Sequence, residues 1–406
     1  MDKSTYINRR KRLMESLDNR SLAILRGSTA VHIYSGNYRP FRQNSNFYYL
    51  TGLNEPNIML FLLKSPSGVS EFLFLERPDE HVEQWERKIL KAKDASLICG
   101  IERSYYIDEV FKVLERLVPS VNNIYIDESF DQFVYNKDLS RDIVQHVRKL
   151  YPTRRFLDIS GNISPLRLIK DKQEINCIKK AVEITGIALD EARQFMHEGI
   201  AENEVLGKII QVFLSCNTYA SFSPIVGSGP ESTILHYDKN SRKTKKNDVI
   251  LIDIGTEYQF YSSDITRTFP SCGKFTDFQR DAYQTVLDAQ EFAFSIAKPG
   301  ISLLDFNKEV REYQKDLYVK RGFAKDKYEA EGIIVHNISH YLGLDPHDPG
   351  DFSIPMQPGM VITVEPGIYM KEKGFGIRIE DDIMITKSGN EILSAGIKKK
   401  LRDIEK

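Results

Sequence analysis

The chain has 406 residues, of which 41% are hydrophobic and 28% charged, and 56 Lys and Arg oppose 57 Asp and Glu for a formal net charge of -1. This balance indicates a globular chain of two or three domains and excludes disordered, collagen-like and coiled-coil proteins. Because the charge provides no overall basic field, we expect neither a nucleic-acid nor a membrane partner. The sequence shows no secretory leader, no run of about 18 apolar residues and no CxxC among its 4 cysteines, which predicts a cytoplasmic protein.

The first 160 residues alternate strand-like and helix-like segments. Short apolar runs predict strands at 21–25, 57–63, 71–75 and 123–126, and helical spacing predicts helices at 107–117 and 140–150. Residues 151–165 are rich in turn-forming residues and lack periodicity. We therefore expect an α/β N-terminal domain over residues 1–160 and a second domain over residues 161–406.

The second domain is predicted to contain one unit twice, each of two helices and a strand pair. The first two helices begin at a capping box over 171–174 and near residue 202, and they end at Gly199 and near residue 216. A hairpin over 249–269 follows. Two further helices, one from a box over 276–279 and one from about 302 to Gly322, precede a hairpin over 360–386. This order predicts an α+β domain with a duplicated helix-helix-hairpin unit.

Each predicted hairpin carries two acids within apolar, β-rich sequence. Asp253 and Asp264 lie in the first hairpin, and Glu365 and Glu380 lie in the second. Buried carboxylates need a raised pKa, a cationic partner or a metal, and the single cation Arg378 cannot serve all of them. A solvated strand face explains any one of these acids equally well, but it explains the four together poorly.

Three of the 8 histidines, His336, His340 and His347, lie close together in the sequence. The first two have the i, i+4 spacing of a helical metal pair, but Gly343 and Pro346 follow closely, so metal binding by both is not assumed. Four carboxylates balance two divalent cations, and oxygen ligands favour Mn²⁺, with Co²⁺ or Zn²⁺ as alternatives. Paired metals commonly bridge a water and lower its pKa, so metal-assisted hydrolysis is the predicted reaction class.

Several stretches resemble the metal-dependent pita-bread peptidases, and in particular their aminopeptidase P branch. They are IVGSGPESTILHY, LIDIGTEYQFYSSDITRTFP, HNISHYLGLDPHD, MVITVEPGIY and IRIEDD, and the N-terminal FRQNSNFYYLTGLNEP is similar to that branch's N-terminal domain. The resemblance covers nearly the whole chain. It implies a pita-bread C-terminal domain that removes the first residue from peptides with proline at position two, by means of a water or hydroxide bridging two metals.

The resemblance also implies the ligand set. Asp253 would chelate one metal, while Asp264 and Glu380 would bridge both metals. His340 and Glu365 would complete the shell of the other metal.

The remaining residues implied by the resemblance are pocket groups: His236, His336, His347, Arg378, Tyr369 and Trp85. His236 and His336 would stabilise the carbonyl and the tetrahedral intermediate, with an ordinary core histidine as the alternative. His347 and Arg378, with Tyr369, would shape the subsite for proline, although Tyr369 is equally well explained as a packed aromatic. Trp85 departs from the family's W-x-G-x-R element because Glu86, Arg87 and Lys88 follow it. It is interpreted either as a residue that reaches a neighbouring subunit's site or as a surface anchor.

Other functions stay open. Prolidase shares the metal shell and cuts only Xaa-Pro dipeptides, and sequence spacing does not separate the two activities. A non-catalytic pita-bread peptide-binding module would have lost the ligands, which are all present. The large N-terminal domain disfavours methionine aminopeptidase, and the intact acids disfavour a metal-free creatinase-like enzyme. The resemblance also implies a homodimer or a homotetramer.

Overall fold

The computed structural model describes the chain except residues 31, 35–36, 39–40, 128–138 and 406. The chain divides into two units, Met1–Arg167 and Leu168–Lys406. Each unit has its own apolar core. No described helix is both long enough and apolar enough to cross a membrane.

The first unit is built on a six-stranded mixed sheet with the order β6-β5-β4-β1-β7-β8. Its strands are β1 Ser21–Arg26, β4 Met59–Ser65, β5 Gly68–Leu75, β6 Ser104–Tyr106, β7 Asn123–Ile126 and β8 Arg155–Asp158, with β2 His32–Tyr34 and β3 Asn37–Tyr38 as a separate pair. Its helices are α1 Lys3–Ser16, α2 Ser45–Thr51, α3 Glu80–Trp85, α4 Ala92–Cys99, α5 Val110–Leu117 and α6 Leu139–Leu150, with 3-10 turns η1 Ile107–Glu109 and η2 Val118–Ser120. Helix α7, Ser160–Leu168, spans the junction of the two units.

The predicted strands and helices of this unit are confirmed to within a few residues, but several elements were not predicted. Helix α1 is the longest of them, and it buries Arg10 completely. The Arg10 guanidinium donates to both carboxylate oxygens of Glu71, at 2.9 and 3.0 Å. Because a charged residue occupies a core position of this helix, the apolar periodicity that identifies a helix is interrupted.

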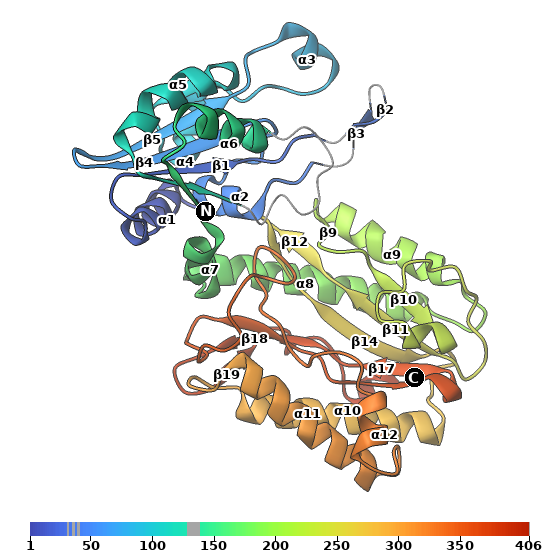
Figure 1. Cartoon of the computed structure of the whole chain (residues 1–406). Helices are drawn as coiled ribbons and strands as arrows, with labels where there is room; N and C mark the ends of the chain where they lie inside the picture. Colours follow the sequence, from blue (N-terminus) through green and yellow to red (C-terminus); the bar gives the residue numbers. More distant parts are fainter. Residues whose placement is uncertain (31, 35–36, 39–40, 128–138, 406) are drawn as a thin grey trace. The chain divides into compact units, whose positions relative to one another are not determined.

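The second unit contains two helix pairs and the strands between them (Figure 1). Its helices are α8 Lys172–Phe195, α9 Glu202–Ser215, α10 Asp277–Ile296, α11 Leu303–Lys320, α12 Lys327–Gly332 and α13 Leu401–Ile404. Its strands are β9 Tyr219–Ala220, β10 Ile225–Ser228, β11 Val249–Ile254, β12 Thr256–Tyr258, β13 Tyr261–Ser262, β14 Ile265–Pro270, β15 Val361–Val364, β16 Gly367–Met370, β17 Phe375–Arg378, β18 Asp381–Ile385 and β19 Asn390–Ile392. The 3-10 turns are η4 Gly229–Thr233 and η5 Lys371–Lys373.

The repeated helix-helix-hairpin unit is confirmed. Helices α8 and α9 precede the antiparallel pair β11–β14, and α10 and α11 precede the antiparallel pair β15–β18. The capping boxes also form, since Asp171 and Thr276 accept hydrogen bonds at the starts of α8 and α10. The prediction that the first helix continues to Gly199 is wrong. The chain leaves the helix at Met196, which is extended, and Gly199 occupies a following turn with φ +84°.

The core of the second unit lies between the helix pairs and the strands. It is one apolar cluster that joins α8 to α11 with both hairpins, and its members include Ile184, Ile252, Val286, Ile362 and Ile383. Full burial of one such side chain contributes about 1.5–3 kcal/mol. This cluster therefore offsets the cost of placing acids on the same hairpins.

Candidate active site

The four predicted acids occupy equivalent places on the two hairpins of the second unit. Asp253 lies in β11, and Asp264 directly precedes β14. Glu365 directly follows β15, and Glu380 directly precedes β18. Because each strand pair is antiparallel, the two acids of one hairpin lie near each other.

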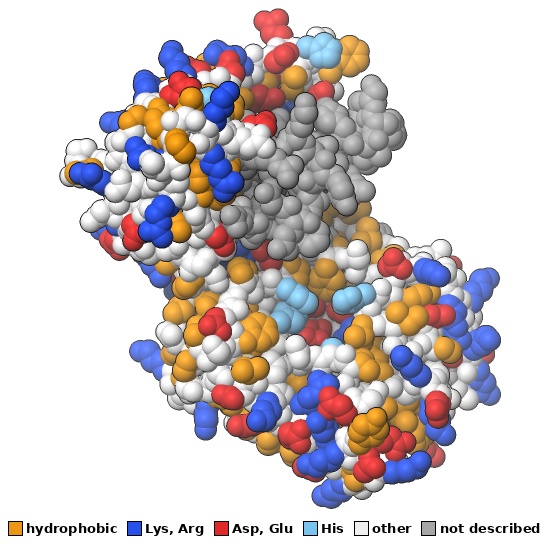
Figure 2. Space-filling model, in the orientation of Figure 1, with side chains coloured by type: hydrophobic (Ala, Val, Ile, Leu, Met, Phe, Trp, Pro, Cys, Tyr) orange, Lys and Arg blue, Asp and Glu red, His pale blue; other side chains and the backbone are white. Residues whose placement is uncertain are grey.

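These acids face a cavity of about 690 Å³. Figure 2 shows histidines and acidic side chains gathered in a hollow on this face of the second unit. The cavity is lined by predicted site residues, namely His236, Asp253, Asp264, His336, His340, His347, Glu365, Arg378 and Glu380, together with apolar groups that include Phe222, Ile225 and Phe352.

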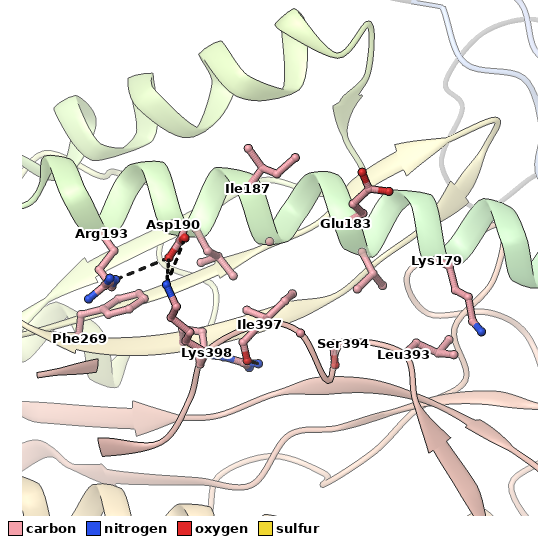
Figure 3. A pocket seen from close by; sticks show the side chains of 15 residues that line it. Lys179, Glu183, Ile187, Asp190, Arg193, Phe269, Leu393, Ser394, Ile397 and Lys398 are labelled. Atoms are coloured by element: carbon pink, nitrogen blue, oxygen red, sulfur yellow. Dashed lines mark hydrogen bonds and ion pairs between the residues drawn. The ribbon is translucent and has the colours of Figure 1, made fainter. Parts of the chain in front are cut away.

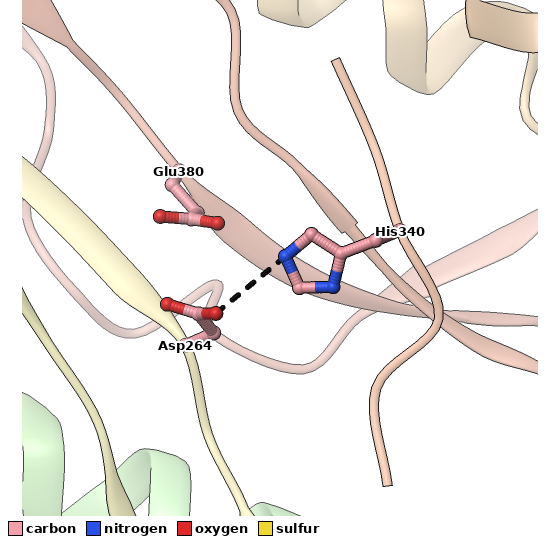
Figure 4. A group of neighbouring side chains, drawn as sticks. All are labelled: Asp264, His340 and Glu380. Atoms are coloured by element: carbon pink, nitrogen blue, oxygen red, sulfur yellow. Dashed lines mark ion pairs between the residues drawn. The ribbon is translucent and has the colours of Figure 1, made fainter. Parts of the chain in front are cut away.

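His340 and the carboxylates form a set of potential metal ligands. One ligand atom from each of Asp264, His340 and Glu380 lies within 4.8 Å of the others (Figure 4). The His340 Nε2 atom also lies 3.4 Å from Glu365 Oε1. His340 Nδ1 lies 3.1 Å from the carbonyl oxygen of Tyr341. Because a carbonyl only accepts, Nδ1 carries the proton and Nε2 presents its lone pair to the carboxylates.

Burial and mutual repulsion shift the pKa values of this set. Burial and then the neighbouring carboxylates raise the pKa of Asp264 and of Glu380 well above the usual range. Burial raises the pKa of Glu365 to about 8 and lowers that of His340 to about 3. Divalent cations would favour the ionised carboxylates and the neutral imidazole that bind them.

Asp253 provides a direct test of whether a cation fits. Its Oδ2 accepts a hydrogen bond from Arg378, while its Oδ1 is buried and has no hydrogen-bond partner among the residues that the structure describes. Buried carboxylate oxygens are rarely left unpartnered. An unpartnered oxygen in an acid-rich cavity is what a metal ligand presents, so the residues present fit a centre of divalent cations.

Arg378, Tyr369 and His336 form a hydrogen-bonded chain beside the acids. The buried Arg378 guanidinium donates to Asp253 at 2.5 Å and to the Tyr369 hydroxyl at 2.7 Å. That hydroxyl lies 2.8 Å from His336 Nε2, and His336 Nδ1 lies 2.6 Å from the carbonyl oxygen of Asn337. Burial, assisted by the charge of Arg378, lowers the pKa of His336 to about 3. The imidazole is therefore neutral, and both its nitrogens are engaged.

Sequence reasoning missed three residues that contact the predicted ligand residues: Thr266, Thr363 and Asp382. The Thr266 hydroxyl donates to Glu380 at 2.7 Å, and the Thr363 hydroxyl lies 3.4 Å from Glu365. The buried Asp382 accepts the backbone N–H of Asp264 at 3.1 Å. Thr266, Thr363 and Asp382 each lie two positions along the chain from a predicted ligand. Since alternate residues of a strand share a face, that spacing is the signal that could have found them.

His236 and His347 are exposed at the cavity, and the predicted histidine pair does not form one helix face. The segment with His336 and His340 is irregular, which agrees with the nearby Gly343 and Pro346. The ring centroids of His340 and His347 are 4.0 Å apart.

Trp85 is the predicted site residue that belongs to the first unit. It ends α3, it is 73% exposed, and its ring stacks on His81 with centroids 5.8 Å apart. The other predicted site residues belong to the second unit.

The loop that carries His236 is fastened by Glu202, a fully buried acid at the start of α9. One carboxylate oxygen accepts from the backbone N–H and the hydroxyl of Ser228, both at 2.7 Å. The other accepts from the Tyr237 hydroxyl and the backbone N–H of Arg242, both at 2.8 Å. Four hydrogen bonds therefore anchor this loop on both sides of His236.

Comparison with known proteins gives matches over both units. Residues 176–387 match the model of metallopeptidase family M24, and residues 6–125 match the N-terminal domain of aminopeptidase P. The Xaa-Pro aminopeptidase of Escherichia coli strain K12 is 34% identical over 431 residues, which cover 100% of this chain and 97% of the relative.

Solved structures agree with this match. E. coli aminopeptidase P with the inhibitor Pro-Leu has a TM-score of 0.92 and 34% identity, covering 100% of this chain and 97% of that chain. The zinc-substituted E. coli enzyme in complex with product also has a TM-score of 0.92, at 33% identity and the same coverage.

Proposed function

The chain belongs to metallopeptidase family M24, and from this premise we propose that it is an aminopeptidase that removes the N-terminal residue from peptides with proline at position two. The observation that carries the proposal is the convergence of Asp264, His340 and Glu380, whose ligand atoms lie within 4.8 Å of one another. Prolidase is not favoured, because two relatives that match over 97% of their own length are Xaa-Pro aminopeptidases. A non-catalytic binding module is not favoured either, because the ligand set is intact.

Five residues would hold two divalent cations in this proposal: Asp253, Asp264, His340, Glu365 and Glu380. We propose Mn²⁺, since four of these five ligands are carboxylates. When bound, such ions polarise a carbonyl and lower the pKa of water. The acid-rich end of the cavity would also bind the free α-amino group of the peptide, which makes the enzyme an exopeptidase.

The other cavity residues would contact the peptide itself or orient side chains that do. His236, exposed at the cavity, would donate to the oxyanion that develops at the scissile carbonyl. His336 would orient the Tyr369 hydroxyl, because both nitrogens of its ring are engaged. His347 and Arg378 would border the subsite for the proline ring. A proline nitrogen carries no hydrogen, so this subsite needs shape rather than a backbone acceptor.

The proposal also covers the cellular location and the oligomeric state of the enzyme. The structure describes all four cysteines and joins none of them in a disulfide, which supports a reducing, cytoplasmic location. The large exposed ring of Trp85 supports a homodimer or homotetramer, since exposed aromatics of this size commonly bury at interfaces. The mass of the protein in solution, compared with that of Trp85→Ala, tests this assembly.

A substrate panel tests the function. We expect the Mn²⁺-loaded protein to cleave Xaa-Pro-Yaa peptides between residues one and two. Acetylation of the N-terminus should abolish cleavage, and alanine in place of proline should lower kcat/KM about 100-fold or more. Asp264→Asn, which removes one proposed ligand, is the matched control against a contaminating peptidase. Equal rates for the alanine and proline peptides would overturn the proline specificity, and turnover of dipeptides alone would move the assignment to prolidase.

A further inference from the structure

Gln290 joins the two sides of the second hairpin directly beside two proposed ligands. This residue of α10 is fully buried. Its side-chain NH₂ group donates to the carbonyl oxygens of Val364 and Ile379, both at 3.0 Å. Val364 directly precedes Glu365, and Ile379 directly precedes Glu380. One amide therefore cross-links the chain segments that carry these two carboxylates, beside the antiparallel ladder of β15 and β18.

Lys399 determines which way the Gln290 amide points. The Lys399 ammonium donates to Gln290 Oε1 at 2.8 Å and to Asp381 Oδ2 at 2.6 Å. An ammonium only donates, so the amide oxygen must face Lys399 and the NH₂ group must face the two carbonyls. The opposite orientation would place an oxygen against two oxygens and an NH₂ group against a cation.

The C-terminal strap, which we define as residues 393–399, holds Lys399 in place. The strap runs along α8 (Figure 3), and a Cβ at Gly186 of that helix would lie 3.1 Å from Ile397. Lys398 pairs with Asp190 of α8 at 3.5 Å. The buried Arg267 also donates to the carbonyl oxygen of Lys398 at 2.9 Å.

Arg267 ties the same network to Glu380. Its guanidinium donates to the carbonyl oxygen of Glu380 at 2.5 Å and pairs with Asp381 at 2.7 Å, with both side chains fully buried. Arg267 thus binds the carbonyl oxygen of Glu380, and Gln290 binds the carbonyl oxygen of the preceding residue, Ile379. Glu365 and Glu380 lie on the two sides of one hairpin and repel each other when ionised, so groups that hold the backbone beside them support their spacing.

We propose that Gln290 is a positioning residue that sets the separation of Glu365 and Glu380, with its amide oriented by Lys399 of the C-terminal strap. The inference rests on the proposed function, in which these two glutamates bind metal. Groups that orient metal ligands commonly change metal affinity about 10- to 100-fold when they are replaced. A purely structural amide would instead change stability and leave the metal affinity of the folded protein unaltered.

Gln314 offers a matched control. It is also fully buried, on the neighbouring helix α11, and its amide donates to the Tyr318 hydroxyl at 2.9 Å. That partner is a hydroxyl rather than a carbonyl next to a ligand. Methionine at either position keeps the length of the side chain and removes its hydrogen bonds.

Mn²⁺ titration of the metal-free proteins by calorimetry tests the inference, with kcat, KM and thermal unfolding measured on the same samples. We expect Gln290→Met to bind at least one ion 10-fold or more weakly and to lower kcat with little change in KM. Gln314→Met should lower the unfolding temperature and leave Mn²⁺ affinity unchanged. If Gln290→Met does not fold, Gln290→Glu keeps the shape and the contact with Lys399, and it should show the same loss of affinity.

The outcomes separate this inference from the function on which it rests. Unchanged Mn²⁺ affinity in the folded Gln290 variant overturns the inference alone, as does an equal loss of affinity in Gln314→Met. An unaltered protein that binds no divalent ion overturns the proposed function, and the inference fails with it.

Discussion

Two half-buried histidines, four positions apart, differ in whether a ring nitrogen is left for a metal ion. His340 bonds a backbone carbonyl through Nδ1 and faces carboxylates through Nε2. His336 also approaches a carbonyl through Nδ1, but its Nε2 meets the Tyr369 hydroxyl. The partner of Nε2, rather than burial or spacing, therefore distinguishes a proposed metal ligand from a residue that orients its neighbour.

Alanine variants of these histidines should behave differently. His340→Ala removes a proposed ligand and should lose at least one Mn²⁺ ion. His336→Ala should retain both ions and lose about 10- to 100-fold in kcat, because the Tyr369 hydroxyl loses its acceptor. Metal content and kcat of the purified variants check this, with the exposed His197 replaced by alanine as the control. Loss of metal from His336→Ala, together with full occupancy in His340→Ala, would show that the ligand role belongs to the other histidine.

The acids of the site could be predicted from the sequence, whereas the groups that hold them carry at most a two-residue spacing from a ligand as their signal. Asp253 and Glu380 are conspicuous because charge is disfavoured in apolar strands. Thr266 and Thr363 are ordinary strand residues, and Gln290 lies in an unremarkable helix. The roles of Thr266 and Gln290 depend on partners 74 to 114 positions away, such as the carbonyl oxygens of Val364 and Ile379 that Gln290 binds.

At the scale of elements, helix starts were predictable because their signals are local. The capping boxes at Asp171 and Thr276 form within one turn and need no tertiary partner. Helix α1 was missed because its buried Arg10 is paired with Glu71 of β5, which a local pattern does not show. The end of α8 was misplaced because a glycine marks a turn but does not determine where the helix stops.

Helix α9 contributes to the site through its first residue, so Glu202→Gln should impair catalysis and leave the metal in place. An amide in place of the carboxylate puts an NH₂ group against N–H or O–H donors, and each buried donor left unpaired costs about 1–3 kcal/mol. We expect stability to fall by about that amount. The activity should fall about 10-fold, since the loop carrying His236 loses an anchor.

Glu204→Gln is the matched control for this prediction. Glu204 lies in the same turn of α9, and its carboxylate accepts only the backbone N–H of Ala201 among the described hydrogen bonds, at 2.8 Å. Denaturant unfolding, kcat/KM and Mn²⁺ content measured on both variants check the expectation. Loss of Mn²⁺ from Glu202→Gln would contradict it, because none of the proposed ligands lies on α9 or on the anchored loop.

At the scale of the whole molecule, the duplication in the second unit was predictable from the order of helices and strands rather than from sequence identity between its two halves. The two halves of the second unit share little sequence, yet each supplies a helix pair and a hairpin with two acids. The duplication places Asp253 and Asp264 in one half and Glu365 and Glu380 in the other. Metal binding should therefore join the two halves of the second unit, and the first unit supplies no proposed ligand.

Mn²⁺ should accordingly protect the second unit and not the first. An ion present at about 100 times its Kd stabilises the folded state by about 2.7 kcal/mol. The free energy needed to open the strands that carry its ligand residues should rise by about the same amount. Hydrogen exchange followed peptide by peptide, with and without Mn²⁺, measures this. We expect slower exchange in β11, β14, β15 and β18 and unchanged exchange in β1, β4, β5 and β7. In Asp264→Asn, Mn²⁺ should no longer slow exchange in β11, β14, β15 and β18. If Mn²⁺ slowed exchange equally in these strands and in β1, β4, β5 and β7 of that variant, the ion would act away from the proposed centre.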